Sequence, residues 1–205
     1  MKLHWSPRSP FVRKVMVFAH DVGVADRIEC VRTVAAMMKP QPDLMIDNPL
    51  SKLPTLVLDD GTALYDSSVI CEYFDHLHGG PKLFPLPFEE RMTALRRQAL
   101  GDGLLDALVL WRGELSRPAE QQSQPYLKSF SVRNEATLAA LEREVPALET
   151  SAYSIGHIAL GCAVAYLDFR FADRQWRRDF PQLARWHATF AARPSVRATE
   201  PVDDA

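Results

Sequence analysis

Residues 48–70 read NPLSKLPTLVLDDGTALYDSSVI, and this stretch contains four consecutive structural signals. Lys52, Leu53 and Pro54 precede a short apolar run that favours a strand. The Asp-Gly pair that follows is typical of a tight hairpin, because these residues tolerate positive φ angles. After a returning strand, Asp66 opens a pattern of apolar residues at helical spacing. The stretch therefore predicts an interrupted backbone edge beside a helix N-terminus, which suits a small, extended, anionic ligand.

The composition of the whole chain excludes several classes of protein. The 205 residues are 47% hydrophobic with a net charge of −2, which argues against a nucleic-acid partner. No apolar run approaches the ~20 residues that a membrane-spanning helix needs, and we expect no membrane association. The three separated cysteines fit neither a metal site nor a disulfide framework. Since the N-terminus also lacks a secretory apolar segment, we expect a cytoplasmic location.

The first 34 residues predict a strand, a helix and a second strand. Residues 3–5 form a short strand candidate, after which Ser9 fits the N-cap and Pro10 the first position of a helix. The helical pattern ends at Gly23, and residues 28–34 alternate between apolar and polar as a strand does. A crossover of this length favours parallel pairing of the two strands with a right-handed connection.

Residues 35–47 fit neither a helix nor a strand and are expected to form an apolar loop. Met37 and Met38 lie within it. The loop either packs a few methionines at the surface or provides a pliable wall for apolar ligands, since methionine adapts its shape easily.

The remainder of the chain predicts helices and no further strand. Residues 79–88 are rich in helix breakers and indicate a linker. Helical patterns cover residues 89–111, 127–148, 154–171 and 181–192. Pro146 is expected to end or kink the second of these, whereas the third is apolar nearly all round and is typical of a buried bundle centre. We expect a small α/β domain at 1–78, the linker at 79–88, and an all-helical domain at 89–205.

Three motifs in this order resemble the bacterial cytosolic glutathione S-transferases. They are SPFVRK at 9–14, KLP at 52–54 and DSSVI at 66–70, and the helical half fits through LGCAVAYLDFR at 160–170. The resemblance covers nearly the whole chain. It implies a thioredoxin-like N-terminal domain, an all-α helical-bundle C-terminal domain and a homodimer. It also implies a cis peptide bond before Pro54, which would turn the backbone of Leu53 outward to pair with a peptide ligand.

The resemblance assigns the protein a chemical task, the activation of the glutathione thiol as a co-substrate. A hydroxyl at a helix N-terminus can lower the thiol pKa by donating a hydrogen bond to sulfur, with help from the helix dipole. Ser9 precedes the helix that Pro10 begins and is the preferred donor, although a plain N-cap role is the alternative. Ser6 is the second choice for this donor. No cysteine stands at either position, which argues against disulfide exchange.

The other residues of the implied glutathione site have separate roles. Ser67 and the helix N-terminus would bind the γ-glutamyl carboxylate, and Asp66 would face the ammonium. Leu53, held by Pro54, would take the middle of the tripeptide, and Lys52 would meet the glycine carboxylate. Phe11 would line the cavity.

The acceptor and the alternatives are less specific in the sequence. The candidates for the wall of the acceptor site are Met37, Met38, Leu105, Trp111 and Tyr166, and a role in core packing would explain each of them equally well. Asp102 and Asp106 lie on a long helix of the kind that such proteins use in dimer contacts. We expect conjugation to a small hydrophobic electrophile. The alternatives are a non-catalytic glutathione-binding or stress-associated protein and a thiol–disulfide enzyme that uses a cysteine.

One position departs from the family pattern. Relatives usually carry an aspartate three residues after the Ser or Thr that begins the most apolar helix, whereas this chain has His157 after Ser154. A neutral histidine is expected to cap less well, which would loosen the start of that helix.

Overall fold

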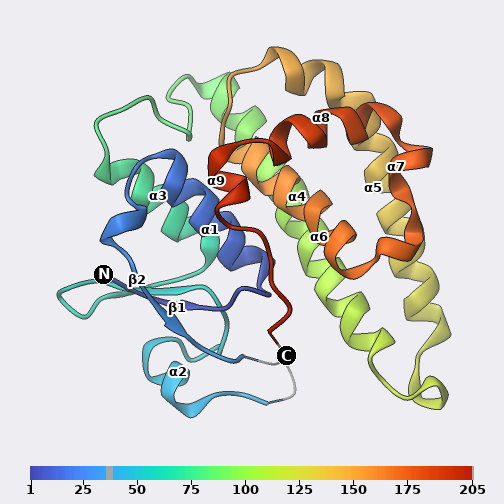
Figure 1. The fold of residues 1–205 in the computed structure, drawn as a ribbon, viewed down its shortest axis with the longest axis horizontal. Helices are drawn as coiled ribbons and strands as arrows, with labels where there is room; N and C mark the ends of the chain where they lie inside the picture. Colours follow the sequence, from blue (N-terminus) through green and yellow to red (C-terminus); the bar gives the residue numbers. More distant parts are fainter. Residues whose placement is uncertain (36–38, 205) are drawn as a thin grey trace. The chain divides into compact units, whose positions relative to one another are not determined.

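A computed structural model describes residues 1–35 and 39–204, and its contacts divide the chain into two compact units (Figure 1). The first unit comprises Met1–Arg91 together with Pro194–Ala205, and the second comprises Met92–Arg193. The last residues of the chain therefore group with the first unit, whereas the sequence-based division at 1–78, 79–88 and 89–205 placed them with the helices. That division of domains remains a prediction.

The first unit is built on a four-stranded sheet in the order β2-β1-β3-β4. Strand β1, Lys2–Trp5, pairs in parallel with β2, Glu29–Arg32, as the crossover length predicted. Strand β3, Thr55–Val57, is antiparallel to both β1 and β4, Ala63–Leu64. The turn between β3 and β4 contains Gly61 at φ 86°, which confirms the hairpin expected from its Asp-Gly pair.

Helices α1, Pro10–Asp21, and α3, Ser67–Leu77, pack against each other, and Figure 1 shows both on one side of the sheet. A short 3₁₀ helix, η1, Ala25–Arg27, connects α1 to β2. Leu3 and Leu56 from the sheet and Phe18 and Phe74 from the helices are fully buried. These apolar side chains form the core that holds the ends of the strands in place.

Residues 42–47 form a helix, α2, Pro42–Asp47, where the sequence predicted an irregular loop. That prediction was wrong for these residues. The helix has only six residues and Pro42 at its start, so apolar periodicity could not reveal it. Contacts outside the helix stabilise it, because the Asp47 carboxylate lies 2.7 Å from His4 Nε2 and 3.3 Å from Lys2 Nζ. Met37 and Met38 lie outside the described residues.

The second unit is helical, and the most apolar segment forms its centre. The elements are α4, Phe88–Leu115, which begins in the first unit; η2, Ala119–Gln121; α5, Gln124–Thr150; α6, Ile155–Arg170; η3, Ala172–Arg174; α7, Trp176–Asp179; and α8, Pro181–Ala191. Every residue of α6 from Ile155 to Leu167 is buried, as its composition predicted. Helix α5 continues four residues past Pro146, so this proline does not end it.

The start of α6 is capped by His157, contrary to the looser start expected from the sequence. Its Nδ1 accepts the Ser154 backbone N–H at 3.2 Å, which completes a capping box. The other ring nitrogen, Nε2, lies 3.1 Å from the Leu148 carbonyl oxygen and donates to it in this tautomer. The imidazole thus caps α6 and also ties it to the end of α5. Burial lowers the pKa of His157, which favours the neutral ring that this arrangement requires.

Candidate functional site

The turn after β1 presents Ser9 at the N-terminus of α1. Its Oγ accepts the Val12 backbone N–H at 3.3 Å, and Pro10 occupies the first turn of the helix, as predicted. The serine is half-buried. A hydroxyl that accepts one hydrogen bond keeps its own proton for donation. The N-cap role and a donor role toward a sulfur are therefore compatible at Ser9.

Ser6, the second-choice hydroxyl, lies deeper in the same turn. It is only 6% exposed, and its Oγ accepts the Arg8 backbone N–H at 3.4 Å. Its carbonyl oxygen accepts the Ser9 N–H at 3.2 Å, which closes the turn. A ligand that reaches this turn from solvent meets Ser9 more readily than Ser6.

The segment Lys52–Pro54 lies just before β3, and the Leu53–Pro54 peptide bond is cis, as the resemblance implied. Pro54 is buried, Leu53 is half-buried and Lys52 is exposed. Among the described residues, the backbone N–H and C=O of Leu53 form no hydrogen bond. This polar backbone can pair with an extended ligand.

A buried asparagine that the sequence analysis did not identify positions this segment. Asn48 is 1% exposed, and its Nδ2 donates to Thr55 Oγ1 at 2.9 Å and to the Lys52 carbonyl oxygen at 3.3 Å. Thr55 Oγ1 in turn donates to the same carbonyl oxygen at 2.9 Å, and Asn48 Oδ1 accepts the Leu50 N–H at 3.0 Å. An Asn-Pro dipeptide favours a turn, and this was the available signal at Asn48, but no local pattern indicates the partners of its side chain.

The N-terminus of α3 forms the third part of the site. Asp66 is its N-cap, and Oδ1 of this residue accepts the Ser68 N–H at 2.9 Å. Asp66 is exposed, whereas Ser67, the first residue of the helix, is buried. The N–H groups of the first turn and the helix dipole favour an anion at this end.

The strand register brings these three parts to one edge of the sheet. Because β1 and β3 are antiparallel, with His4 opposite Thr55, the end of β1 lies beside the start of β3. Likewise Leu64 of β4 pairs with Leu56, so the chain leaves β4 toward α3 at the same edge. The turn with Ser9, the Leu53 backbone and the α3 N-terminus therefore adjoin one another.

The remaining predicted residues do not all belong to this edge. Phe11 is half-buried on α1. Leu105, Trp111 and Tyr166 are buried in the second unit, where Trp111 packs on Phe130 and Phe171, so their packing role is evident. Asp102 is half-buried and Asp106 is exposed on α4.

Residues 1–35 and 39–204 contain neither a metal-binding cluster nor a single membrane-spanning helix. No group of three or more His, Cys, Asp or Glu side chains there has the arrangement of a metal site. No single helix in the same ranges is long and apolar enough to cross a bilayer; α6 and the segment Ala172–Asp179 pass that test only together, with a 95° bend between them.

A mixed four-stranded sheet with this cis-proline segment, followed by a helical unit, is the fold of the glutathione S-transferases. Two family models match the chain, the glutathione S-transferase N-terminal domain over residues 8–77 and the C-terminal domain over residues 135–189. The chain is also 32% identical to the uncharacterized GST-like protein YibF of Escherichia coli K12, over 98% of each chain. The chain belongs to the glutathione S-transferase family.

Several solved structures are similar to this one. A glutathione transferase family member from Pseudomonas fluorescens Pf-5, with bound glutathione, is 41% identical with a TM-score of 0.95, over 98% of this chain and 99% of that chain. A structure described in the same words, but with bound S-(propanoic acid)-glutathione, is 40% identical with a TM-score of 0.90, over 99% and 100%. A glutathione S-transferase from Methylobacillus flagellatus KT with bound glutathione is 33% identical with a TM-score of 0.87, over 98% and 99%.

Proposed function

We propose that this protein is a glutathione transferase that activates the glutathione thiol at Ser9 and adds it to a small, largely apolar electrophile. The observation that carries the proposal is the meeting of the Ser9 hydroxyl, the Leu53 backbone and the α3 N-terminus at one sheet edge. The relatives from Pseudomonas fluorescens and Methylobacillus flagellatus, whose structures contain glutathione, support glutathione as the ligand.

Glutathione is an extended tripeptide whose groups match the parts of this edge. In our proposal its γ-glutamyl carboxylate lies at the α3 N-terminus against Ser67, and Asp66 accepts from the ammonium. The middle of the tripeptide pairs with the Leu53 backbone, which Pro54 orients, as an added strand would. The exposed Lys52 meets the glycine carboxylate, and Phe11 lines the site.

The α1 N-terminus provides the environment for thiol activation. A free thiol has a pKa near 8.5, so about 3% is thiolate at pH 7. Lowering the thiol pKa by two units corresponds to about 2.7 kcal/mol of preferential stabilisation of the thiolate and would raise that fraction to roughly 75%. The Ser9 hydroxyl and the helix dipole supply this stabilisation in our proposal. The thiolate then attacks the electrophilic carbon; with an aryl chloride the C–S bond forms, the C–Cl bond breaks and chloride leaves.

A reaction through a protein cysteine is less well supported. Cys71 and Cys162 are buried, and Cys30 is exposed. Desolvation raises the pKa of the Cys30 thiol, which reduces its thiolate fraction and hence its nucleophilicity. The non-catalytic binding protein remains the second candidate, because the three parts of the site could bind glutathione without activating it.

We also propose that the protein forms a homodimer. Ile46, Leu50 and Val69 of the first unit are 83%, 64% and 47% exposed. Exposed apolar side chains of this size can be buried at an interface between two copies of the chain. Sedimentation tests this proposal by comparing the molecular mass of the purified protein with that of an Ile46→Lys variant. A dimer mass that is the same in both proteins would show that Ile46 is not part of the contact.

The test of the catalytic proposal removes the Ser9 hydroxyl with little loss of helix stability. Glycine is nearly as good an N-cap as serine, so Ser9→Gly costs a few tenths of a kcal/mol in stability while it removes the donor. Turnover of 1-chloro-2,4-dinitrobenzene and the ultraviolet absorbance of bound thiolate against pH are measured for Ser9→Gly and for Ser6→Ala. We expect Ser9→Gly to raise the bound thiol pKa by one to two units, which lowers the thiolate fraction at pH 7 about 3- to 25-fold, with Ser6→Ala near wild type.

The outcomes distinguish the candidate functions. Full activity in Ser9→Gly with loss of activity in Ser6→Ala would transfer the role to Ser6. Glutathione binding without turnover over a panel of electrophiles would favour the non-catalytic protein.

A further inference from the structure

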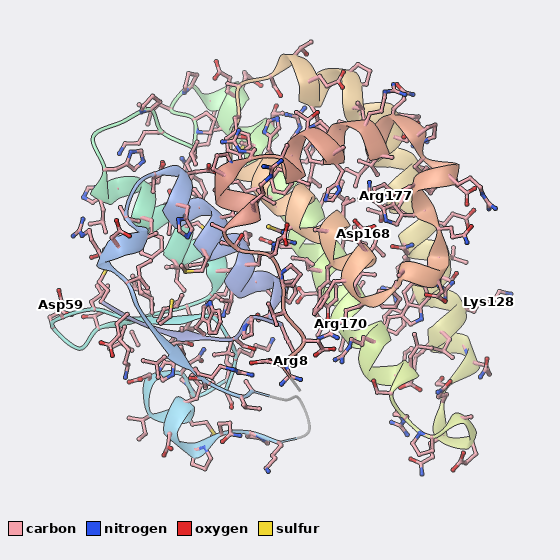
Figure 2. All side chains as sticks on the ribbon, viewed as in Figure 1. Arg8, Asp59, Lys128, Asp168, Arg170 and Arg177 are labelled. Atoms are coloured by element: carbon pink, nitrogen blue, oxygen red, sulfur yellow. The ribbon has the colours of Figure 1, made fainter. Side chains whose placement is uncertain are left out.

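Two arginines of the first unit share one carboxylate beside the turn that contains Ser9. Arg32 donates from Nε and Nη2 to Asp204 Oδ2, at 2.8 and 2.7 Å. Arg8 Nε lies 3.1 Å from the other oxygen, Oδ1, and Arg8 Nη1 lies 3.8 Å from Asp203. Figure 2 labels Arg8, which lies next to the C-terminal segment. Charge-assisted bonds of this geometry define a receptor for a carboxylate.

This receptor lies at the edge of the sheet that holds the proposed reaction centre. Arg8 immediately precedes Ser9, so their Cα atoms are about 3.8 Å apart. Arg32 ends β2 and pairs with Trp5, the last residue of β1. Since β1 and β2 are parallel, Arg32 at the end of β2 and Arg8 in the turn that follows β1 both lie at the carboxyl ends of these strands, where open α/β sheets bind ligands.

The segment that fills the receptor is held by exchangeable contacts. Beyond Thr199 the described chain has no regular structure, and its residues 200–204 form no backbone–backbone hydrogen bond. Val202, in the middle of this segment, is 57% exposed. The side chains of Arg8, Arg32 and Asp204 are each about one-third exposed. Ion pairs at this exposure are weak and screened by salt, so Asp204 can leave without unfolding the unit.

We propose that Arg8 and Arg32 form a binding site for a carboxylate on the electrophilic acceptor, and that Asp204 occupies this site until the acceptor displaces it. The proposal rests on the proposed transferase function and deepens it, because it names the chemical class of the acceptor: a small apolar body that carries a carboxylate. When Asp204 leaves, the two guanidinium groups repel each other, and an incoming carboxylate relieves that repulsion. The site thereby selects anionic acceptors next to the activated sulfur.

The first experiment compares two acceptors that differ in one charge, 4-chloro-3-nitrobenzoate and 4-chloro-3-nitrobenzamide. With each, the C–S bond forms, the C–Cl bond breaks, chloride leaves and the thiol proton goes to solvent. The quantity measured is the ratio of kcat/KM for benzoate to that for benzamide, so that intrinsic reactivity cancels between variants. Wild type, Arg32→Gln and Asp204→Asn are compared with Arg178→Gln, a control that removes an arginine from the exposed pair with Asp179.

We expect opposite changes in the two test variants. Arg32→Gln removes two charge-assisted bonds and should lower the ratio about tenfold. Asp204→Asn removes the competing carboxylate and should raise the ratio severalfold through a lower KM for benzoate. Arg178→Gln should leave the ratio unchanged. Equal ratios in all four proteins, while glutathione binds and benzamide is turned over, would overturn the carboxylate site and leave the proposed function intact.

A binding measurement covers the case in which neither acceptor is turned over. The Arg32 Nε–H signal and the Asp204 amide signal are followed by ¹⁵N-resolved NMR during titration with benzoate and, separately, with benzamide. We expect the benzoate, and not the benzamide, to shift both signals together. In Asp204→Asn the Arg32 signal should reach its final position at a lower benzoate concentration than in wild type. Unmoved signals would refute the carboxylate site. Shifts without any turnover would retain it and count against the transferase function.

Discussion

Asn48 offers the sharpest test of how the fold positions the glutathione site. Its side chain makes three hydrogen bonds: one to the Leu50 N–H within the turn after α2, and two, to the Lys52 carbonyl oxygen and the Thr55 hydroxyl, that join this turn to the start of β3. Asn48→Ala deletes all three. We expect this variant to lose both stability and glutathione affinity, for two separable reasons.

The loss of stability follows from the number of bonds. A buried hydrogen bond contributes about 1 kcal/mol net, so three bonds correspond to about 3 kcal/mol. The Lys52 carbonyl keeps one donor in the variant, the Thr55 hydroxyl, which limits the penalty for an unpaired group. The loss of affinity follows from entropy, because fixing the backbone of one residue costs about 1–2 kcal/mol. If glutathione must re-order a single residue of the segment Lys52–Pro54, its affinity falls about 5- to 30-fold.

Calorimetric titration with glutathione and urea unfolding measure the two effects. Leu141→Ala in the second unit serves as the control, since this fully buried leucine should cost about 2–5 kcal/mol of stability without changing the affinity. Thr55→Val removes the hydroxyl that Asn48 contacts, so the double variant should be less destabilised than the sum of the single variants by about 1 kcal/mol. A folded Asn48→Ala protein with wild-type glutathione affinity would refute the positioning role.

Three further predictions concern the second unit. The free energy of unfolding should decrease as the pH falls below about 6.5, because the folded-state pKa of His157 lies below its unfolded value and the unfolded chain therefore binds more protons. Urea unfolding at several pH values should show that the free energy of unfolding depends less on pH in His157→Gln than in wild type. Glu142→Ala should cost about 1–2 kcal/mol, because this carboxylate accepts the Gln182 and Leu183 N–H groups at the start of α8, at 3.0 and 2.7 Å, and amide exchange of that first turn should rise, whereas unchanged exchange would refute the cap. Gly101→Ala should cost several kcal/mol by thermal denaturation, since its Cβ would lie 2.6 Å from the backbone carbon of Ala159, with Gly103→Ala as the control because nothing lies within 4 Å there.

The elements that the sequence predicted well are those with local signals. Pro10 and Ser9 mark the start of α1 through one fixed φ angle and one cap, both of which need only neighbouring residues. The hairpin between β3 and β4 likewise depends on a turn that Gly61 allows. The cis bond before Pro54 came only from the family resemblance, because few X–Pro bonds are cis and no local pattern selects them.

The elements that the sequence predicted poorly depend on distant partners. Helix α2 is too short for apolar periodicity, and its last residue, Asp47, pairs with His4 and Lys2 more than forty positions earlier. The hydrogen bonds of Asn48 and the Arg8–Asp204 contact are likewise tertiary. His157 shows a different failure. Its cap was judged by charge alone, whereas the neutral ring both accepts from Ser154 and donates to Leu148.

The same distinction between accepting and donating changes how Ser9 is interpreted. From sequence, an N-cap serine and a thiol-activating serine were competing explanations, so evidence for one counted against the other. In the structure the Ser9 oxygen accepts from Val12, and this bond leaves the hydroxyl proton available. The cap also fixes the oxygen at the positive end of α1, where a thiolate gains most from the dipole. The N-cap bond thus places the hydroxyl for the proposed chemistry, and Ser9→Gly, which removes the hydroxyl and its bond to Val12 at little cost in helix stability, decides whether the hydroxyl acts on sulfur.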